Sequence, residues 1–259
     1  MSDKVLYEVI DGVGVITLNR PEVHNALDDE AAHLYKDLLD RALDDDGVRA
    51  VLLQGAGKSF CSGRDTSMLG HRARDESDYH FVLRHQQKRL AVMDSPKPFI
   101  AALKGAALGG GCETALSCDI RIADTTLKMA LPEIHYGILP DTGGTQLMTT
   151  LIGPSRTKYM VMTGDRINAE TALAWGAVDF VVAPEELEAR ALDLARKIAA
   201  KPPIALAMAK TMIDQIHAGA VRSGIAQELL AQTALFKTED YEEARTALRE
   251  KRTPAYKGK

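Results

Sequence analysis

The chain has 259 residues, of which 46% are hydrophobic, 26% charged and only 5% aromatic. This length and composition are typical of a globular protein with one large core or two smaller ones, and they exclude a disordered tail or a fibre. The formal net charge of −4, from 32 basic and 36 acidic residues, provides no broad positive field, so we expect no nucleic acid as the main partner.

The first part of the chain predicts two strands, a helix and a third strand. Alternating apolar residues and an Asp11-Gly12 turn indicate a hairpin that ends with the apolar run Val13 to Leu18. Apolar residues at helical spacing from Asp28 onward indicate an amphipathic helix, for which Asn25 is the expected cap. The run Val48 to Leu53 then predicts a buried strand.

The middle of the chain continues this alternation. Phe99 to Leu103 and Ile120 to Ala123 are expected to be strands, with a short helix starting at Glu113 between them. This order is typical of an α/β fold. The highly charged segment Met68 to Arg89 interrupts the order, and we expect a mobile helix or loop there, at the rim of a site.

After Pro184 the sequence predicts helices only. Apolar residues recur at helical spacing over 187–198, 204–216, 225–236 and 241–248. We therefore expect an α/β core over residues 1–200, which carries the active site, and an all-helical region over residues 201–259.

The cysteines and histidines show no metal-binding or disulfide pattern. Cys61, Cys112 and Cys118 are odd in number and contain no Cys-x-x-Cys pair, and the histidines form no His-Glu-x-x-His motif. No stretch of about 18 apolar residues occurs, and the first residues lack an apolar signal core. We expect a cytoplasmic protein that binds neither a metal nor a membrane.

A glycine-rich loop links an expected strand to the helix near Glu113. Gly109, Gly110 and Gly111 let a ligand approach the backbone, and the amides of a first helical turn point at it. Such amides can stabilise a developing oxyanion. A tight turn would explain one or two of these glycines, but three followed by an acid favour a site. The small residues of the loop 55–65, after another strand, could supply a second amide.

Three acidic residues follow in the same part of the chain, namely Glu113, Glu133 and Asp141. Carboxyl groups that face one cavity can act as proton donor and acceptor when their environments separate their pKa values. Glu113 could instead be only a favourable charge at a helix start, and Asp141 only a cap for a helix that begins near Gly143. The residues by themselves leave these alternatives open.

Together these motifs resemble those of the enoyl-CoA hydratase/isomerase, or crotonase, family. Asn19-Arg20-Pro21 and Glu250-Lys251-Arg252 match the two ends of that family, so the resemblance covers essentially the whole chain. It implies a spiral of ββα turns for the core, C-terminal helices that build a homotrimer, and commonly a dimer of trimers. The matching central runs are Leu108-Gly109-Gly110-Gly111-Cys112-Glu113, Cys118-Asp119-Ile120, Pro132-Glu133-Ile134, Gly143-Gly144-Thr145-Gln146 and Thr163-Gly164-Asp165.

The resemblance also implies roles for individual positions. The amides of Arg64 and Gly110 would form an oxyanion hole for the thioester carbonyl of an acyl-CoA, which is the substrate, so that no separate cofactor is implied. Glu113 and Glu133 would be the two hydratase carboxylates, which add water to a trans-2-enoyl-CoA. The residues expected to bind the substrate, with the adenine end of coenzyme A near 64–67, are Asn25, Ser62, Asp65, Thr66, Ser67 and Gly111.

Two positions depart from the hydratase pattern. Arg64 stands where hydratases of the family typically have a small residue, and Asp141 stands where they usually have glycine. Isomerases of the family place a catalytic aspartate at the latter position, so an enoyl- or dienoyl-CoA isomerase that uses Asp141 and a glutamate is the alternative. A dehalogenase branch, with a base near His85, would need tryptophan in place of Glu133. A non-catalytic function, as an RNA-binding or scaffold member of the family, is a further alternative. The net charge of −4 and the presence of both glutamates argue against it.

Overall fold

The computed structural model describes residues 3–71 and 75–259, so Arg72 and Arg74 of the charged segment lie outside the described residues. A six-stranded sheet has the order β1-β2-β3-β4-β6-β9. β1 and β2 pair antiparallel, as the predicted hairpin requires, and the other neighbours pair parallel. Its strands are β1 (Val5–Ile10), β2 (Val13–Leu18), β3 (Ala50–Gly55), β4 (Phe99–Leu103), β6 (Ile120–Asp124) and β9 (Phe180–Val182).

A second, three-stranded sheet lies next in the spiral. β5 (Ala106–Leu108) pairs parallel with β7 (Lys128–Ala130), which pairs antiparallel with β8 (Ile167–Asn168). Because β4 leads into β5 and β6 leads into β7, the strands from β4 to β7 belong alternately to the large and the small sheet. This is the expected α/β spiral of strand, strand and helix, and it brings the ends of β5 and β7 to one edge.

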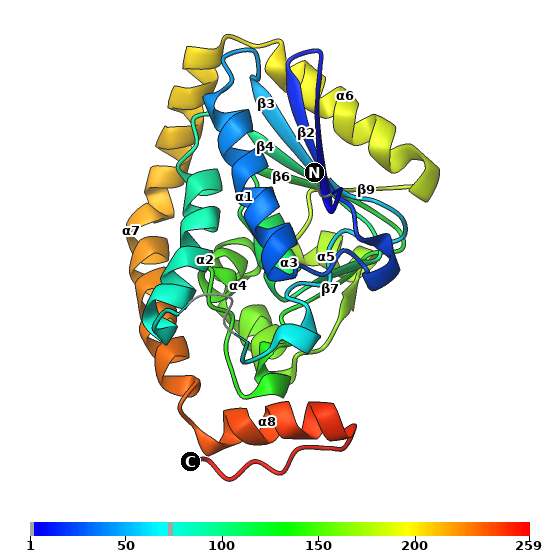
Figure 1. Ribbon diagram of the computed structural model, residues 1–259. Helices are drawn as coiled ribbons and strands as arrows, with labels where there is room; N and C mark the ends of the chain where they lie inside the picture. The colour runs from blue at the N-terminus through cyan, green and yellow to red at the C-terminus, as the bar shows by residue number, and fades with distance from the viewer. Residues whose placement is uncertain (1–2, 72–74) are drawn as a thin grey trace.

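Helices cover both faces of the large sheet, as Figure 1 shows for α1 and α6. Tyr35 and Leu39 of α1 are buried in the main core on one face, whereas Leu187 and Ala191 of α6 pack on the other face. Strands buried on both sides read as continuous apolar runs, which explains why the sequence predicted them well. The helices are α1 (Asp29–Asp44), α2 (Asp78–Met93), α3 (Gly110–Leu116), α4 (Gly144–Thr163), α5 (Ala169–Trp175), α6 (Leu187–Ala199), α7 (Pro203–Leu235) and α8 (Glu239–Glu250), with short 3-10 helices at Pro21–Val23, Thr66–Met68, Glu133–Tyr136 and Pro184–Glu186.

The C-terminal region is helical, but the first two helices predicted there form a single continuous helix. The sequence predicted separate helices over 204–216 and 225–236, whereas α7 runs without a break through Gly219. A glycine inside a helix costs only about 1 kcal/mol, which the packing of the second half of α7 against α2 and α4 offsets. Figure 1 shows α7 along one side of the molecule and α8 beneath it. Within the described residues no helix is both long and apolar enough to cross a membrane.

Two predicted helix starts are also corrected. Asp28, not Asn25, caps α1, because the Asp28 side chain accepts the N–H of Ala31. Helix α3 begins at Gly110, three residues before Glu113. The charged segment that interrupts the pattern contains most of α2, whose Ser77 side chain caps it by accepting the N–H of His80.

Candidate active site

A cavity of about 580 Å³ opens where the loops after β3, β5 and β7 meet the helices α1, α2 and α7. In parallel sheets the carboxyl ends of the strands are the usual place for ligands, because the loops that follow them converge there. Glu113, Glu133 and Asp141 all line this cavity, as do Arg64 and Gly110. The fold therefore brings together the five residues expected to carry the chemistry.

Two backbone amides lie side by side at one wall of the cavity. Leu27 donates its N–H to the carbonyl of Gly63 at 2.8 Å and accepts the N–H of Asp65 at 3.0 Å, so the N–H of Arg64 turns away from Leu27. Gly110 is the first residue of α3, where an amide has no acceptor within the helix. A Cβ built on Gly110 would lie 4.0 Å from the Arg64 nitrogen. The two amides are thus placed to bind one carbonyl oxygen.

The side chain of Glu113 is held by the start of α4. It is buried in the first turn of α3, and its Oε1 accepts the N–H of Thr142 at 2.8 Å and the N–H of Gly144 at 2.9 Å. A Cβ on Gly144 would lie 2.9 Å from the same oxygen, so the close approach requires glycine. Two donors on one oxygen fix the orientation of this carboxylate in the cavity.

Glu133 begins the short helix Glu133–Tyr136, which follows β7 and Pro132. Its Oε2 is enclosed and has no hydrogen-bond partner among the described residues. Burial, and then the charge of Glu113, raise the pKa of Glu133 well above its ordinary value. Its Oε1 would lie 3.0 Å from a Cβ on Gly109, so the carboxyl faces the glycine loop. The environment of Glu133, close to Glu113, therefore favours its protonated form.

Asp141 lies just before α4 and is not its cap. The cap position is Gly143, whose N–H is accepted by Glu228 of α7. Burial raises the pKa of Asp141 well above its ordinary value, and the charges of Glu113 and Glu228 add to this shift. Its backbone carbonyl accepts the side-chain amide of Gln86 at 2.8 Å. A third carboxyl group thus lines the cavity, where burial favours its protonated form.

The residues expected to bind the substrate divide into two groups. Ser62, Asp65 and Thr66 line the cavity, whereas Asn25, Ser67 and Gly111 are not among its lining residues. Asn25 is buried and accepts the N–H of Arg20 while its amide donates to the carbonyls of Ala56 and Ser59. A Cβ on Gly111 would lie 2.2 Å from the carbonyl oxygen of Cys61. Ser67 donates its hydroxyl and its N–H to Asp65. These three residues shape the loops behind the cavity.

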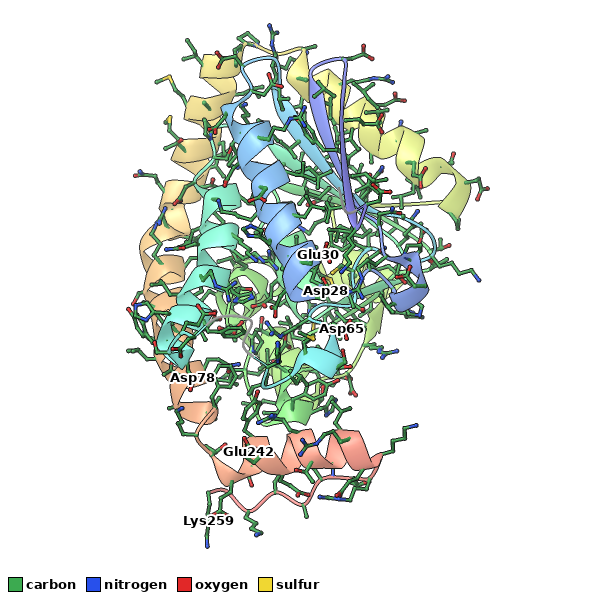
Figure 2. The ribbon with its side chains drawn as sticks, viewed as in Figure 1. Asp28, Glu30, Asp65, Asp78, Glu242 and Lys259 are labelled. Atoms are coloured by element: carbon green, nitrogen blue, oxygen red, sulfur yellow. The ribbon has the colours of Figure 1, made fainter. Side chains whose placement is uncertain are left out.

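The rim of the cavity beside α1 is rich in charged pairs. Figure 2 shows Asp28 and Asp65 near one another at the start of α1. The guanidinium of Arg20 lies 3.4 Å from Asp28 Oδ2 and 3.4 Å from Asp65 Oδ2, and Lys4 pairs with Asp28 at 2.8 Å, so two cations balance these two carboxylates. The Ser67 hydroxyl, and then Arg20, lower the pKa of Asp65.

Sequence reasoning missed four residues that line or support this cavity. Tyr35, Lys88, Arg89 and Glu228 are all buried, and the first three line the cavity itself. The available signal was a polar side chain at an inward position of an amphipathic helix, for example Glu228 between Ile225 and Leu229. Within the described residues no group of three or more His, Cys, Asp or Glu side chains is arranged to hold a metal ion.

Comparison with known proteins places this fold and site among enzymes that act on CoA thioesters. Residues 8–259 match the model of the enoyl-CoA hydratase/isomerase family. The short-chain-enoyl-CoA hydratase of Clostridium acetobutylicum is 38% identical over 252 residues, covering 96% of each chain. The (E)-benzylidenesuccinyl-CoA hydratase of Thauera aromatica is 38% identical over 255 residues, covering 98% of this chain and 99% of the other.

Solved structures agree with the sequence comparison. The crystal structure of an enoyl-CoA hydratase from Mycobacterium avium subsp. paratuberculosis K-10 superposes with a TM-score of 0.87 at 28% identity and covers 98% of both chains. The chain therefore belongs to the enoyl-CoA hydratase/isomerase (crotonase) family, and the α/β crotonase fold expected from the sequence is confirmed. Several relatives at 35–38% identity are named as hydratases of CoA thioesters.

Proposed function

We propose that the chain is an enoyl-CoA hydratase, a hydro-lyase that adds water across the 2,3 double bond of a trans-2-enoyl-CoA. The observation that carries this proposal is the pairing of an anchored carboxylate, Glu113, with a neutral carboxylic acid, Glu133, in one cavity. Hydration needs both a group that accepts a proton from water and a group that delivers one to carbon. The names of the hydratase relatives support the same reaction.

In the proposed reaction the amides of Arg64 and Gly110 bind the thioester oxygen, which gains negative charge as the enolate forms. Glu113 accepts a proton from a water molecule while the water oxygen bonds to C3. Glu133 gives its proton to C2. Over the whole reaction one O–H bond of water and the π bond between C2 and C3 break, and one bond from C3 to oxygen and one bond from C2 to hydrogen form. A proton passed from Glu113 to Glu133 restores the starting state. The cavity wall at Ser62, Asp65 and Thr66 is the proposed contact for coenzyme A.

The test is the turnover of crotonyl-CoA, followed by the loss of its conjugated-thioester absorbance. Glu133→Gln and Glu113→Gln should each slow hydration by at least about 10², the usual contribution of acid–base catalysis. Glu170→Gln, at an exposed position in α5, is the matched control and should turn over crotonyl-CoA at the normal rate. Unchanged turnover by Glu133→Gln would exclude the mechanism with two glutamates.

A double-bond isomerase is the second candidate, and Asp141 is the observation that favours it. A carboxyl group whose pKa is raised by burial can move a proton between two carbons of an acyl chain. We propose to distinguish the two activities with a 3-enoyl-CoA in deuterated water. If Asp141→Gly abolishes deuterium exchange between C2 and C4 and raises hydration, isomerisation is the native reaction. If the wild type and Asp141→Gly both show no exchange and the variant hydrates crotonyl-CoA more slowly, hydration is the native reaction.

We further propose that residues 201–259 are an oligomerisation region that builds a homotrimer or a dimer of trimers. The first half of α7 presents large apolar side chains to solvent, which monomers seldom do. The same region also closes the cavity, because Gln232, Phe236 and Tyr241 line it. Light scattering of the variant Met212→Glu should report a smaller assembly. The exposed apolar side chains are Ile204 (76%), Met208 (62%), Met212 (72%), Ile213 (66%) and Ile216 (74%).

A reducing compartment such as the cytoplasm is the proposed location. Cys61, Cys112 and Cys118 are all free and buried. Burial raises the pKa of the Cys61 thiol to about 11 and that of the Cys118 thiol to about 12. Thiols that stay protonated react slowly, so these residues fit a packing role rather than redox chemistry.

A further inference from the structure

Helix α2 turns cationic side chains toward the cavity, where an amphipathic helix usually presents apolar ones. Lys88 is only 7% exposed and Arg89 only 6% exposed, and both line the cavity. His85 and Phe81, one and two turns earlier on the same face of α2, line it as well. Burying a cation is costly unless a partner compensates it, so the partners of these residues are informative.

Within the described residues these partners are incomplete. Residues 3–71 and 75–259 provide no hydrogen bond or ion pair to the ammonium of Lys88. Arg89 donates one Nη2 hydrogen bond to the carbonyl of Gly110 at 2.7 Å, but its Nε is enclosed and has no described partner. The hydroxyl of Tyr35, which is 2% exposed on the same cavity, has no described partner either. The ammonium of Lys88, the guanidinium of Arg89 and the hydroxyl of Tyr35 thus line the same cavity, and each has at least one N–H or O–H group without a described acceptor.

The charges around Lys88 do not supply the missing anion. Burial, and then the nearby Arg89, Arg84 and Arg64, lower the pKa of Lys88 to about 7. Asp29 is the acid that opposes this shift, and its Oδ1 lies 3.6 Å from the Arg64 guanidinium. Within the described part of the chain, this end of the cavity therefore carries more positive than negative charge.

The other titratable groups on these walls do not change that balance. Burial, and then the charges of Glu113 and Glu228, raise the pKa of Asp141, although the nearby Arg64 and Arg89 lower it. His85 donates Nδ1–H to the carbonyl of Phe81 at 2.8 Å, and burial lowers its pKa well below the ordinary value. Arg84 is paired with Glu76. Burial thus favours the neutral forms of Asp141 and His85, and Arg84 is paired with Glu76. Lys88 and Arg89 are therefore not fully compensated within the described part of the chain, and a bound anion would favour the charged form of Lys88.

The cluster lies at the acyl side of the site. Arg89 is hydrogen-bonded to Gly110, whose own amide is the proposed donor to the thioester oxygen. In coenzyme A the pantetheine arm separates the thioester from the phosphates. Arg89, which is hydrogen-bonded to Gly110, is therefore closer to the acyl carbons than to the phosphates. The side chains of the cluster are also more buried than the rim at Asp28 and Asp65, which is half-buried and paired with cations.

We propose that the substrate's acyl group carries a carboxylate, which binds between Lys88, Arg89 and the hydroxyl of Tyr35. This inference rests on the proposed acyl-CoA site and names the substrate class within it. A carboxylate offers several acceptor sites on two oxygens, which matches the ammonium, the unpartnered guanidinium N–H and the phenol. Lys88 and Tyr35 then determine specificity, since they touch the acyl group away from the reacting carbons.

The test is a comparison of adipoyl-CoA with hexanoyl-CoA, which have the same chain length and differ by the terminal carboxylate. Both are saturated, so calorimetry measures their binding without any turnover. The wild type should bind adipoyl-CoA at least about tenfold more tightly, as expected for one charge-assisted hydrogen bond. Succinyl- with butanoyl-CoA and suberoyl- with octanoyl-CoA extend the comparison to shorter and longer chains.

Lys88→Met removes the charge and keeps the length of the side chain. It should bring the two dissociation constants to within about twofold, and Tyr35→Phe, which leaves the core filled, should reduce the preference about fivefold. Lys36→Met, a lysine of α1 paired with Asp40 on the surface, is the control and should keep the preference. If Lys88→Met does not fold, the effect of Tyr35→Phe decides.

Equal affinity of the wild type for both thioesters at every chain length would overturn the inference and leave the hydratase proposal intact. If Lys88→Met lost affinity for adipoyl-CoA and hexanoyl-CoA equally, Lys88 would be assigned to the phosphates of coenzyme A. This result would also overturn the inference. If the wild type bound no thioester at all, the acyl-CoA site itself would be wrong.

Discussion

Glu113 and Glu228 share the backbone amides at the start of α4. Glu113 accepts the N–H groups of Thr142 and Gly144, and Glu228 accepts those of Gly143 and Thr145, at 2.7 and 3.1 Å. The two carboxyl groups therefore alternate along four consecutive amides. Through them the helix α7, more than a hundred residues later in the chain, is connected to the proposed catalytic base.

Replacement of Glu228 by glutamine should impair catalysis without impairing binding. Glutamine keeps one acceptor oxygen and places an NH₂ group against an amide that also donates, so the first turn of α4 should shift and Glu113 with it. We expect kcat for crotonyl-CoA to fall about tenfold, the value of one charge-assisted hydrogen bond, while KM changes less than about twofold. Glu170→Gln is the control. A rise in KM with unchanged kcat would show that Glu228 does not position Glu113.

Glu228 should also make the stability of the protein depend on pH. Burial, and then the charge of Glu113, raise the pKa of Glu228 to about 7 from an ordinary value of 4.5. The folded state thus holds this proton more tightly than the unfolded state. The stabilisation is complete below about pH 4.5 and is lost as the pH rises to about 7, by on the order of 3 kcal/mol.

This dependence is measured by urea unfolding of the wild type and of Glu228→Gln between pH 5 and pH 8. The variant lacks the titrating group, so its free energy of unfolding should increase relative to the wild type as the pH rises. Parallel curves for the two proteins would contradict the assignment of this pKa.

The parts of the fold that the sequence predicted are those governed by local pattern. The buried strands at Phe99–Leu103 and Ile120–Asp124 and the glycine turn before Glu113 each have their signal within ten residues. The partners of Glu113 and the charges that face Lys88 come from distant segments, and no local pattern encodes those contacts. The prediction of Asn25 as a helix cap was wrong for a related reason. Its side-chain amide donates to the backbone carbonyls of Ala56 and Ser59, which lie in a distant loop.

The raised pKa of Glu133 predicts an alkaline limit to activity. Glu133 must be protonated to deliver a proton to C2, so hydration should decrease as the pH rises through its pKa, which lies well above the ordinary value for glutamate. We expect kcat to fall on the alkaline side of this pKa. In Glu133→Gln the residual rate should lose this limb. An alkaline limb that persists unchanged in the variant would assign it to another group.

The position of the Arg64 amide should depend on Gly63. Gly63 has φ 89°, and a Cβ there would lie 2.6 Å from the carbonyl oxygen of Leu108 and 3.2 Å from the nitrogen of Gly110. Gly63→Ala must therefore push the Arg64 and Gly110 amides apart, and kcat/KM for crotonyl-CoA should fall by about 10², the effect of losing one oxyanion donor. Gly219→Ala is the matched control, because Gly219 lies in α7 with no heavy atom near its missing Cβ. It should keep full activity and raise the free energy of unfolding by up to about 1 kcal/mol. Normal activity in Gly63→Ala would mean that the two amides do not act together on the thioester.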